Sequence, residues 1–128
     1  MTRFIIDSYA WIEYFLSTDK GVIVKNTIEN KENSIYTHVF SLAEIASRIS
    51  RAEGDYKNPI DVILSSSEVI GIDNQKSVHT GLLHSEMRKR IKDFGLVDSF
   101  ILLAARELNA KILTGDPHFK NMKEAIMI

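Results

Sequence analysis

The sequence predicts a three-layer α/β/α domain with a mainly parallel central sheet of about five strands. Short apolar runs alternate along the chain with segments whose apolar residues recur at helical spacing. This alternation is typical of βαβ units, which build parallel sheets with helices on both faces. The chain has 128 residues, which is enough for one core. We therefore expect a single domain over residues 1–128, without repeats or linkers.

The first predicted strand is the apolar run Phe4–Ile6, which ends at Asp7. The following segment, Ser8–Leu16, has helical spacing, so an acid lies between a strand and a helix. Ser8 could cap this helix or direct its hydroxyl toward whatever Asp7 holds. A more polar helix is expected next, at Gly21–Lys31, with an inward face made by Val22, Ile23 and Ile28.

A second strand is predicted at Ser34–His38 and a helix at Val39–Ala52. Glu44 lies in the second turn of that helix, beside its apolar stripe. A surface glutamate is the usual interpretation of that position, and an inward-pointing ligand is the less common one. A loop, a short helix at Pro59–Leu64 and a third strand at Glu68–Ile72 follow.

A long helix is predicted at Asn74–Lys92, with Val78, Leu82 and Ile91 on its apolar side. Basic residues crowd its end. Such a cluster suits the negative end of a helix dipole, and it could equally contact RNA phosphates. The candidate RNA contacts are therefore Arg88, Lys89, Arg90 and Lys92, together with Arg48 and Arg51 of the preceding long helix.

Two further candidate acids, Asp98 and Asp116, lie within Gly95–Phe119. Apolar residues at helical spacing between Val97 and Leu108 predict a helix with Asp98 in its first turn. The dipole favours an anion there by roughly 0.3–1 kcal/mol. Taken alone, Asp98 could simply be a residue that starts a helix.

The segment Lys111–Thr114 is predicted to be a short buried strand that ends at Gly115-Asp116-Pro117. Asp116 alone could be a capping residue, but it also lies at a strand's carboxyl end, where open α/β sheets bind ligands. A last strand is expected at Glu124–Ile128.

In a parallel sheet the acids would converge, because strand ends share one edge. Asp7 and Asp116 end strands, Asp98 starts a helix that packs on the sheet, and Glu44 lies near the start of another. Two like charges 4 Å apart repel by about 4 kcal/mol at an effective dielectric near 20. A hard divalent cation would offset this repulsion, because Mg²⁺ and Mn²⁺ prefer carboxylate oxygens. The chemistry implied is metal-assisted hydrolysis of a phosphodiester.

Composition limits the other possibilities. The chain has no cysteine, which excludes disulfides, thiolate metal sites and a cysteine nucleophile. The formal net charge is −1, so nucleic-acid binding would rely on a local basic patch or on metal ions. The N-terminus runs directly into a strand-like segment, and no apolar run approaches a membrane span of about 18 residues. We expect a cytoplasmic protein without membrane contact.

The sequence resembles the PIN domain family, and within it the VapC-type toxins. The resemblance covers nearly the whole chain and rests on four short segments in order. They are FIIDS at residues 4–8, SLAEI at 41–45, LVDSFILLA at 96–104 and ILTGDPHF at 112–119. It implies that residues 1–128 form a PIN-like nuclease domain.

The resemblance also implies roles for particular residues. Asp7, Glu44 and Asp98 would be the core ligands of Mg²⁺ or Mn²⁺, and Asp116 a fourth acid that holds metal directly or through water. Ser8 and Thr114 would be polar supports of the site. The activity implied is metal-dependent endoribonuclease cleavage of single-stranded RNA by the toxin of a toxin-antitoxin pair. A homodimer and a cognate antitoxin that occupies the acidic groove are further implications.

Other functions fit the sequence less well. Phosphoryl transfer of the haloacid dehalogenase class requires a second aspartate two residues after Asp7, where this chain has Tyr9. A receiver domain needs paired acids after the first strand, which are not evident. The remaining alternative is a catalytically silent PIN-fold module that binds RNA or a protein partner. The complete acid set argues against such a module.

Overall fold

The computed structural model describes all residues, 1–128, and confirms the α/β class. Its sheet has five strands in the order β3-β2-β1-β4-β5. Every neighbouring pair is parallel, so the sheet is wholly and not just mainly parallel. The strands are β1 (Thr2–Ile6), β2 (Asn33–His38), β3 (Glu68–Ile70), β4 (Lys111–Thr114) and β5 (Ala125–Met127).

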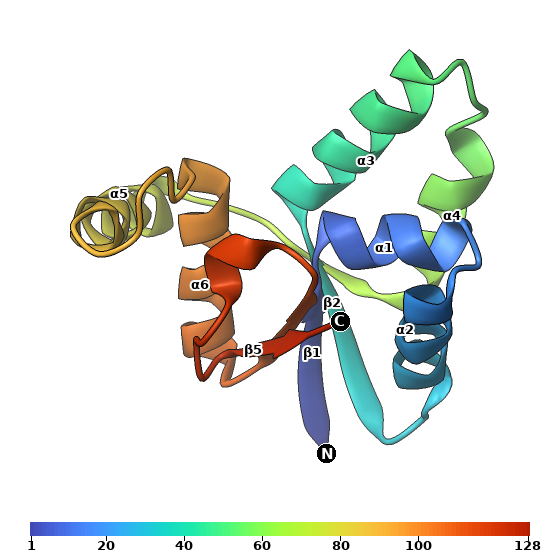
Figure 1. The fold of residues 1–128 in the computed structure, drawn as a ribbon, viewed down its shortest axis with the longest axis horizontal. Helices are drawn as coiled ribbons and strands as arrows, with labels where there is room; N and C mark the ends of the chain where they lie inside the picture. The colour runs from blue at the N-terminus through green and yellow to red at the C-terminus, as the bar shows by residue number, and fades with distance from the viewer.

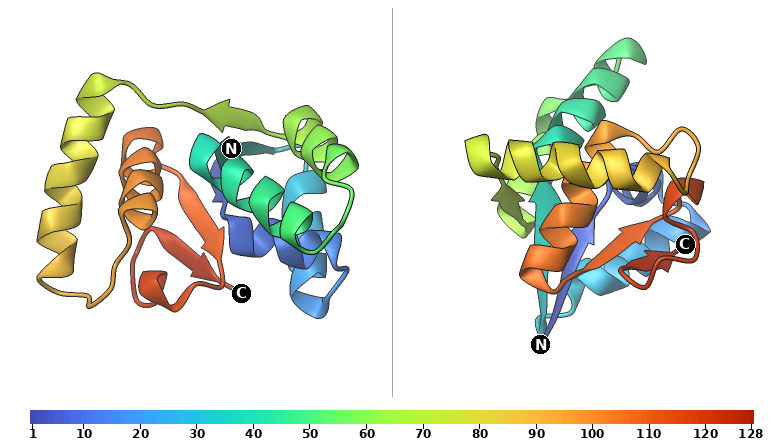
Figure 2. Two further views of the ribbon diagram at one scale, coloured as in Figure 1. Left: turned by 90° about the horizontal axis from the view of Figure 1, so that it is seen from above. Right: turned by 90° about the vertical axis from the view of Figure 1, so that its left-hand side faces the viewer.

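Helices cover both faces of the sheet, as predicted (Figure 1). Helices α5 and α6 lie side by side on one face, and the views of Figure 2 show α5 as the outer of the two. The other face carries α1 to α4. The helices are α1 (Ser8–Phe15), α2 (Asp19–Glu29), α3 (Val39–Arg51), α4 (Lys57–Ser66), α5 (Asn74–Arg88), α6 (Leu96–Leu108) and the short 3-10 helix η1 (Pro117–Phe119). None of these helices combines the length and apolar character needed to cross a membrane.

Two hydrophobic cores form because successive strand residues point to opposite faces. Ile5 and Ile112 belong to the core beneath α5 and α6. Their neighbours Ile6 and Leu113 belong to the core beneath α1 to α4. The neighbouring strands β1 and β4 therefore contribute to both cores.

The inward face of α2 differs from the prediction. Val22 and Ile23 are 52% and 49% exposed, whereas Gly21 and Val24 are buried. The reason is a close approach of α2 to α1: a Cβ on Gly21 would lie 2.2 Å from the backbone oxygen of Glu13. Because only glycine fits at this contact, the buried stripe of α2 starts at Gly21.

Helix α5 also differs from the prediction. It ends at Arg88 and not at Lys92. Val78 and Leu82 are 63% and 65% exposed, and the buried residues of this helix are Thr80 and Met87. At 100° per residue, Val78 and Leu82 lie on the side opposite Thr80. Since α5 packs mainly on α6, the stripe that includes Leu83 and Met87 is covered, and Val78 and Leu82 remain at the surface.

Candidate metal centre at the carboxyl edge of the sheet

The candidate site lies at the carboxyl edge of the sheet, where β1 and β4 are neighbours. The chain moves outward from β1 to β2 and β3 on one side, and β4 and β5 lie on the other. This reversal of strand order is the place where open α/β sheets bind ligands. Asp7 follows β1 directly, and Asp116 follows β4 after one intervening residue. The strands thus bring these two predicted acids together.

Asp7 is a buried carboxylate, 5% exposed. It precedes α1 but makes no side-chain hydrogen bond to the start of that helix. Its Oδ2 instead accepts a hydrogen bond of 2.7 Å from the Thr114 hydroxyl. Burial raises the pKa of Asp7 to about 6, and the nearby carboxylates of Glu44 and Asp116 add to this increase. The pKa would be higher still without the hydrogen bonds from Thr114 and the Ser8 backbone.

Thr114 connects the loops that carry the two acids. Its Oγ1 donates to Asp7 and accepts a hydrogen bond of 3.0 Å from the backbone N–H of Asp116. The next residue, Gly115, packs under the ring of Tyr9, and a Cβ there would lie 2.2 Å from that ring. These contacts hold the backbone between β4 and Asp116 in one position.

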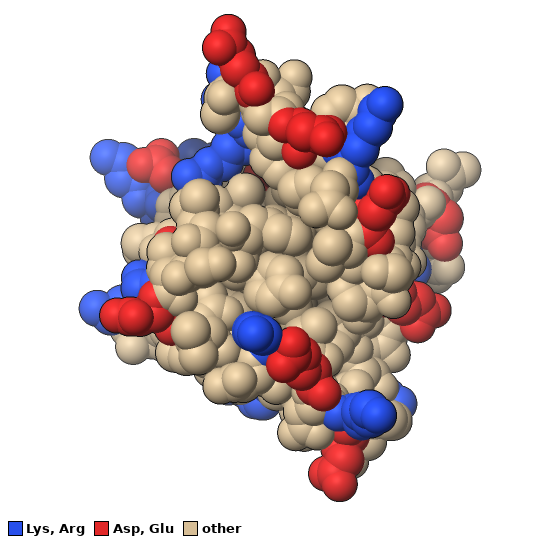
Figure 3. All heavy atoms as spheres, turned by 90° about the vertical axis from the view of Figure 1, so that its right-hand side faces the viewer, with Lys and Arg blue, Asp and Glu red and all other residues tan.

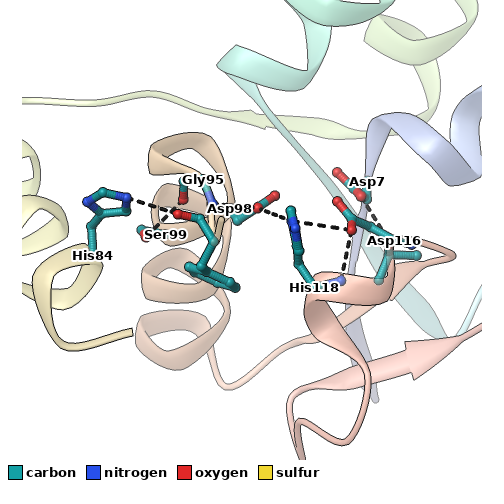
Figure 4. A network of polar contacts seen from close by, with 9 residues as sticks. Asp7, His84, Gly95, Asp98, Ser99, Asp116 and His118 are labelled. Atoms are coloured by element: carbon teal, nitrogen blue, oxygen red, sulfur yellow. Dashed lines mark hydrogen bonds and ion pairs between the residues drawn. The ribbon is translucent and has the colours of Figure 1, made fainter. Parts of the chain in front are cut away.

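Asp98 lies in the first turn of α6, as predicted. Its Oδ2 accepts a hydrogen bond of 2.9 Å from the backbone N–H of Gly95. The loop before the helix is held in turn by Ser99, whose hydroxyl donates to the Gly95 oxygen at 3.1 Å, and by His84, whose Nε2 lies 3.0 Å from the Phe94 oxygen. Asp98 therefore caps its own helix while the carboxyl group faces Asp116 and His118 (Figure 4).

Glu44 approaches the other acids from α3. Its side chain is exposed, but partial loss of solvent raises the pKa of its carboxyl group, and the charges of Asp98 and Asp116 raise it further. The neighbouring Ser8 side chain acts in the opposite direction. All four predicted carboxylates thus lie close enough to influence one another.

His118 is a member of this site that the sequence pattern did not indicate. Its Nδ1 lies 2.9 Å from Asp98 Oδ2 and 3.5 Å from Asp116 Oδ1, and Figure 4 shows the imidazole between these two acids. The three side chains offer ligand atoms that all lie within 4.8 Å of one another. The available signal was its position two residues after Asp116, in a turn begun by Pro117. The same position also suits a surface histidine in the first turn of a helix.

The predicted basic residues lie on two sides of the acids. Arg48 and Arg51 line a groove between α1 and α3 that also contains Ser8 and Glu44. The second group, Arg88 to Lys92, lies at the end of α5 and in the turn that leads to α6. All these side chains except that of Lys89, which pairs with Glu86 at 3.0 Å, are free of salt bridges. RNA contact by both groups stays a prediction.

The donor atoms fit a divalent cation. Carboxylate oxygens predominate, which suits Mg²⁺ and Mn²⁺. Burial is the main cause of the raised pKa of Asp7, and the negative charges of Glu44 and Asp116 add to it. The arrangement could therefore bind a metal ion and present it to a phosphodiester.

The family and the fold of the chain can be compared with known ones. Residues 4–125 match the family described as the PIN domain. The fold is similar to VapBC2 from Rickettsia felis bound to promoter DNA, with a TM-score of 0.75, 20% identity and coverage of 99% of this chain and 98% of that one. Comparison with curated proteins gives no match.

Two further solved structures have the same fold. VapC20 from Mycobacterium tuberculosis, described as a toxin that cleaves the sarcin-ricin loop, has a TM-score of 0.75 and 14% identity, with 94% of this chain and 95% of that chain covered. DNA-bound VapBC from Salmonella typhimurium has a TM-score of 0.70 and 20% identity, with 100% and 98% covered.

Proposed function

This chain belongs to the PIN domain family, and from that premise we propose that it is a metal-dependent endoribonuclease that cleaves single-stranded RNA as the toxin of a toxin-antitoxin pair. The observation that carries the proposal is the convergence of Asp7, Glu44, Asp98 and Asp116 at one edge of the sheet. A group of mutually repelling carboxylates lowers the stability of the fold, and a bound catalytic metal ion would offset this repulsion.

All four acids would act as metal ligands in the proposed mechanism. Asp7, Glu44 and Asp98 would hold Mg²⁺ or Mn²⁺, and Asp116 would hold it directly or through water. When bound, the ion supplies a water of lowered pKa and stabilises negative charge on the phosphodiester. Thr114 keeps Asp7 oriented through its hydroxyl, and Ser8 would support Glu44 beside it.

Cleavage of a labelled pool of single-stranded RNA by the purified protein tests this proposal. We expect cutting with Mn²⁺ or Mg²⁺ and none with EDTA, because without metal the acids would repel the phosphodiester. Calorimetry on the same preparation reports metal binding independently. Metal binding without cutting of any RNA would contradict the nuclease and favour a catalytically silent module that binds RNA or a protein.

We also propose an antitoxin and a second copy of the chain as partners. The comparison structures from Rickettsia felis and Salmonella typhimurium are described as VapBC bound to DNA, which supports a protein partner here. The side on which α2 and α4 lie has a broad area without charged side chains (Figure 3). On the opposite side of the molecule (Figure 1), exposed Val78 and Leu82 of α5 offer apolar surface for association.

The basic residues of the groove between α1 and α3 should contribute to RNA affinity through phosphate charge. We expect that neutralising Arg48 and Arg51 to Gln reduces the slope of log affinity against log salt by about 1.4, or about 0.7 for each contact with a single strand. Fluorescence anisotropy of a labelled RNA measures this slope. The Asp98→Asn background with Mg²⁺ prevents cleavage during the titration.

A matched control removes the same charge from the opposite end of the molecule. Lys25 and Lys31 are exposed on and after α2, before β2 begins. Their replacement by Gln should leave the slope close to that of the parent protein. Equal slopes for the two double variants would exclude Arg48 and Arg51 as phosphate contacts.

A further inference from the structure

His118 is held firmly between two acids of the site. Its ring lies beside Phe94, with ring centroids 6.1 Å apart. Its backbone N–H donates to Asp116 Oδ1 at 2.9 Å, and the next residue, Phe119, is fully buried. Because η1 is anchored at both ends, the imidazole has little freedom to leave its position between Asp98 and Asp116.

The separations around this imidazole suit coordination of one metal ion. With bonds of about 2.1 Å, adjacent ligands of an octahedral ion lie about 3.0 Å apart. The Nδ1 atom of His118 is 2.9 Å from Asp98 Oδ2 and 3.5 Å from Asp116 Oδ1. A small cation could therefore replace the hydrogen bond between imidazole and carboxylate with little movement of either side chain. The side chain of His118 is 35% exposed, so solvent and ions can reach it.

We propose that His118 is a nitrogen ligand of the metal ion bound by Asp98 and Asp116, and that it gives the site a preference for Mn²⁺ over Mg²⁺. This inference rests on the metal-dependent function proposed above. Mg²⁺ favours oxygen ligands, whereas imidazole suits transition metals. Coordination through Nδ1 requires the neutral tautomer with its proton on Nε2.

Replacement of His118 by Asn separates a ligand from a residue that only positions Asp98. The Asn amide nitrogen can take the place of Nδ1 and still donate to Asp98, but it cannot supply an imidazole. We expect Mn²⁺ binding, measured by calorimetry, to weaken by about 10-fold or more, the lower range for a perturbed metal site. Mg²⁺ binding should change much less. His79→Asn, an exposed histidine of α5, is the matched control and should alter neither affinity.

Pulsed electron paramagnetic resonance of the Mn²⁺-loaded wild-type chain gives a second measurement that does not depend on how the variant folds. We expect coupling to a directly bound nitrogen, which should disappear in His118→Asn and persist in His79→Asn. Bound Mn²⁺ without nitrogen coupling in the wild type, or coupling that survives in His118→Asn, would overturn the proposal. So would a chain that binds no Mn²⁺.

These outcomes are separate from failure of the proposed nuclease. RNA cleavage by a site without nitrogen coupling would contradict the role of His118 alone. Nitrogen coupling in a protein that cuts no RNA would support the metal site and contradict the nuclease.

Discussion

Asp98→Asn is expected to reduce the rate of RNA cleavage by at least about 100-fold, because loss of a ligand should exceed the 10- to 100-fold effect of disturbing the residues around a metal site. The substitution removes a negative charge and a strong metal donor but little volume. The amide oxygen of Asn can still accept the hydrogen bond from Gly95 that starts α6. The variant should therefore fold and fail only in metal binding and catalysis. Initial cleavage rates at saturating Mn²⁺ measure the effect.

The matched control is Asp93→Asn, which removes the same charge five residues earlier. Asp93 is exposed in the turn between α5 and α6, and its φ of 64° is one that Asn tolerates well. Its replacement should leave the rate within about two-fold of wild type, as expected for a charge that binds no metal. If Asp98→Asn kept more than a tenth of the wild-type rate, Asp98 would not be a metal ligand.

The acids could be placed from sequence because each sits at the boundary of an element with a clear pattern. Alternating apolar runs and helical spacing located β1, β4 and α6, and a parallel sheet necessarily brings the ends of such strands to one edge. Asp7, Asp98 and Asp116 follow from that argument. Glu44 could not be oriented in this way, since the apolar stripe of α3 leaves it beside the core. The sequence pattern gives an inward-pointing ligand only as the less common interpretation, and the resemblance to a family favours it.

The features that could not be predicted from the sequence depend on contacts between elements. The position of His118 depends on how η1 meets α6, and no local pattern encodes that meeting. The predicted inward face of α2 is wrong because it depends on the tertiary contact of Gly21 with Glu13. Val78 and Leu82 look like core residues at helical spacing. They are exposed because α5 packs mainly on α6 and they lie on its opposite side.

Asp7→Asn should inactivate the enzyme and yet stabilise the metal-free protein at pH 7. The folded-state pKa of Asp7, about 6, is above the ordinary value of 3.8. The folded chain therefore binds more protons than the unfolded chain between about pH 4 and pH 6, and its stability falls as pH rises through this window. A shift of about two pKa units corresponds to roughly 3 kcal/mol. Asn carries no charge, so the variant avoids this loss.

Urea unfolding in EDTA at pH 4 and pH 7 measures the difference between variant and wild type. The gap should be small at pH 4 and reach up to about 3 kcal/mol at pH 7. His38 acts oppositely, because burial lowers its pKa to about 4 and stability is lost as pH falls from about 6.5 toward 4. This effect is common to both proteins and cancels in the comparison. Asp61→Asn, an exposed acid of α4, should show no gap at either pH.

Addition of Mn²⁺ should reverse the order of stability at pH 7. An ion at about 1,000 times its dissociation constant stabilises the folded state by about 4.1 kcal/mol, which exceeds the gap of up to about 3 kcal/mol expected without metal. Wild type would gain this amount, whereas Asp7→Asn, which lacks a core ligand, would gain much less. The same buried charge that weakens the metal-free fold would then strengthen the loaded one. Two results would show that the ionised Asp7 does not destabilise the metal-free fold. One is a variant less stable than wild type in EDTA at pH 7, and the other is a difference in unfolding free energy that does not change with pH.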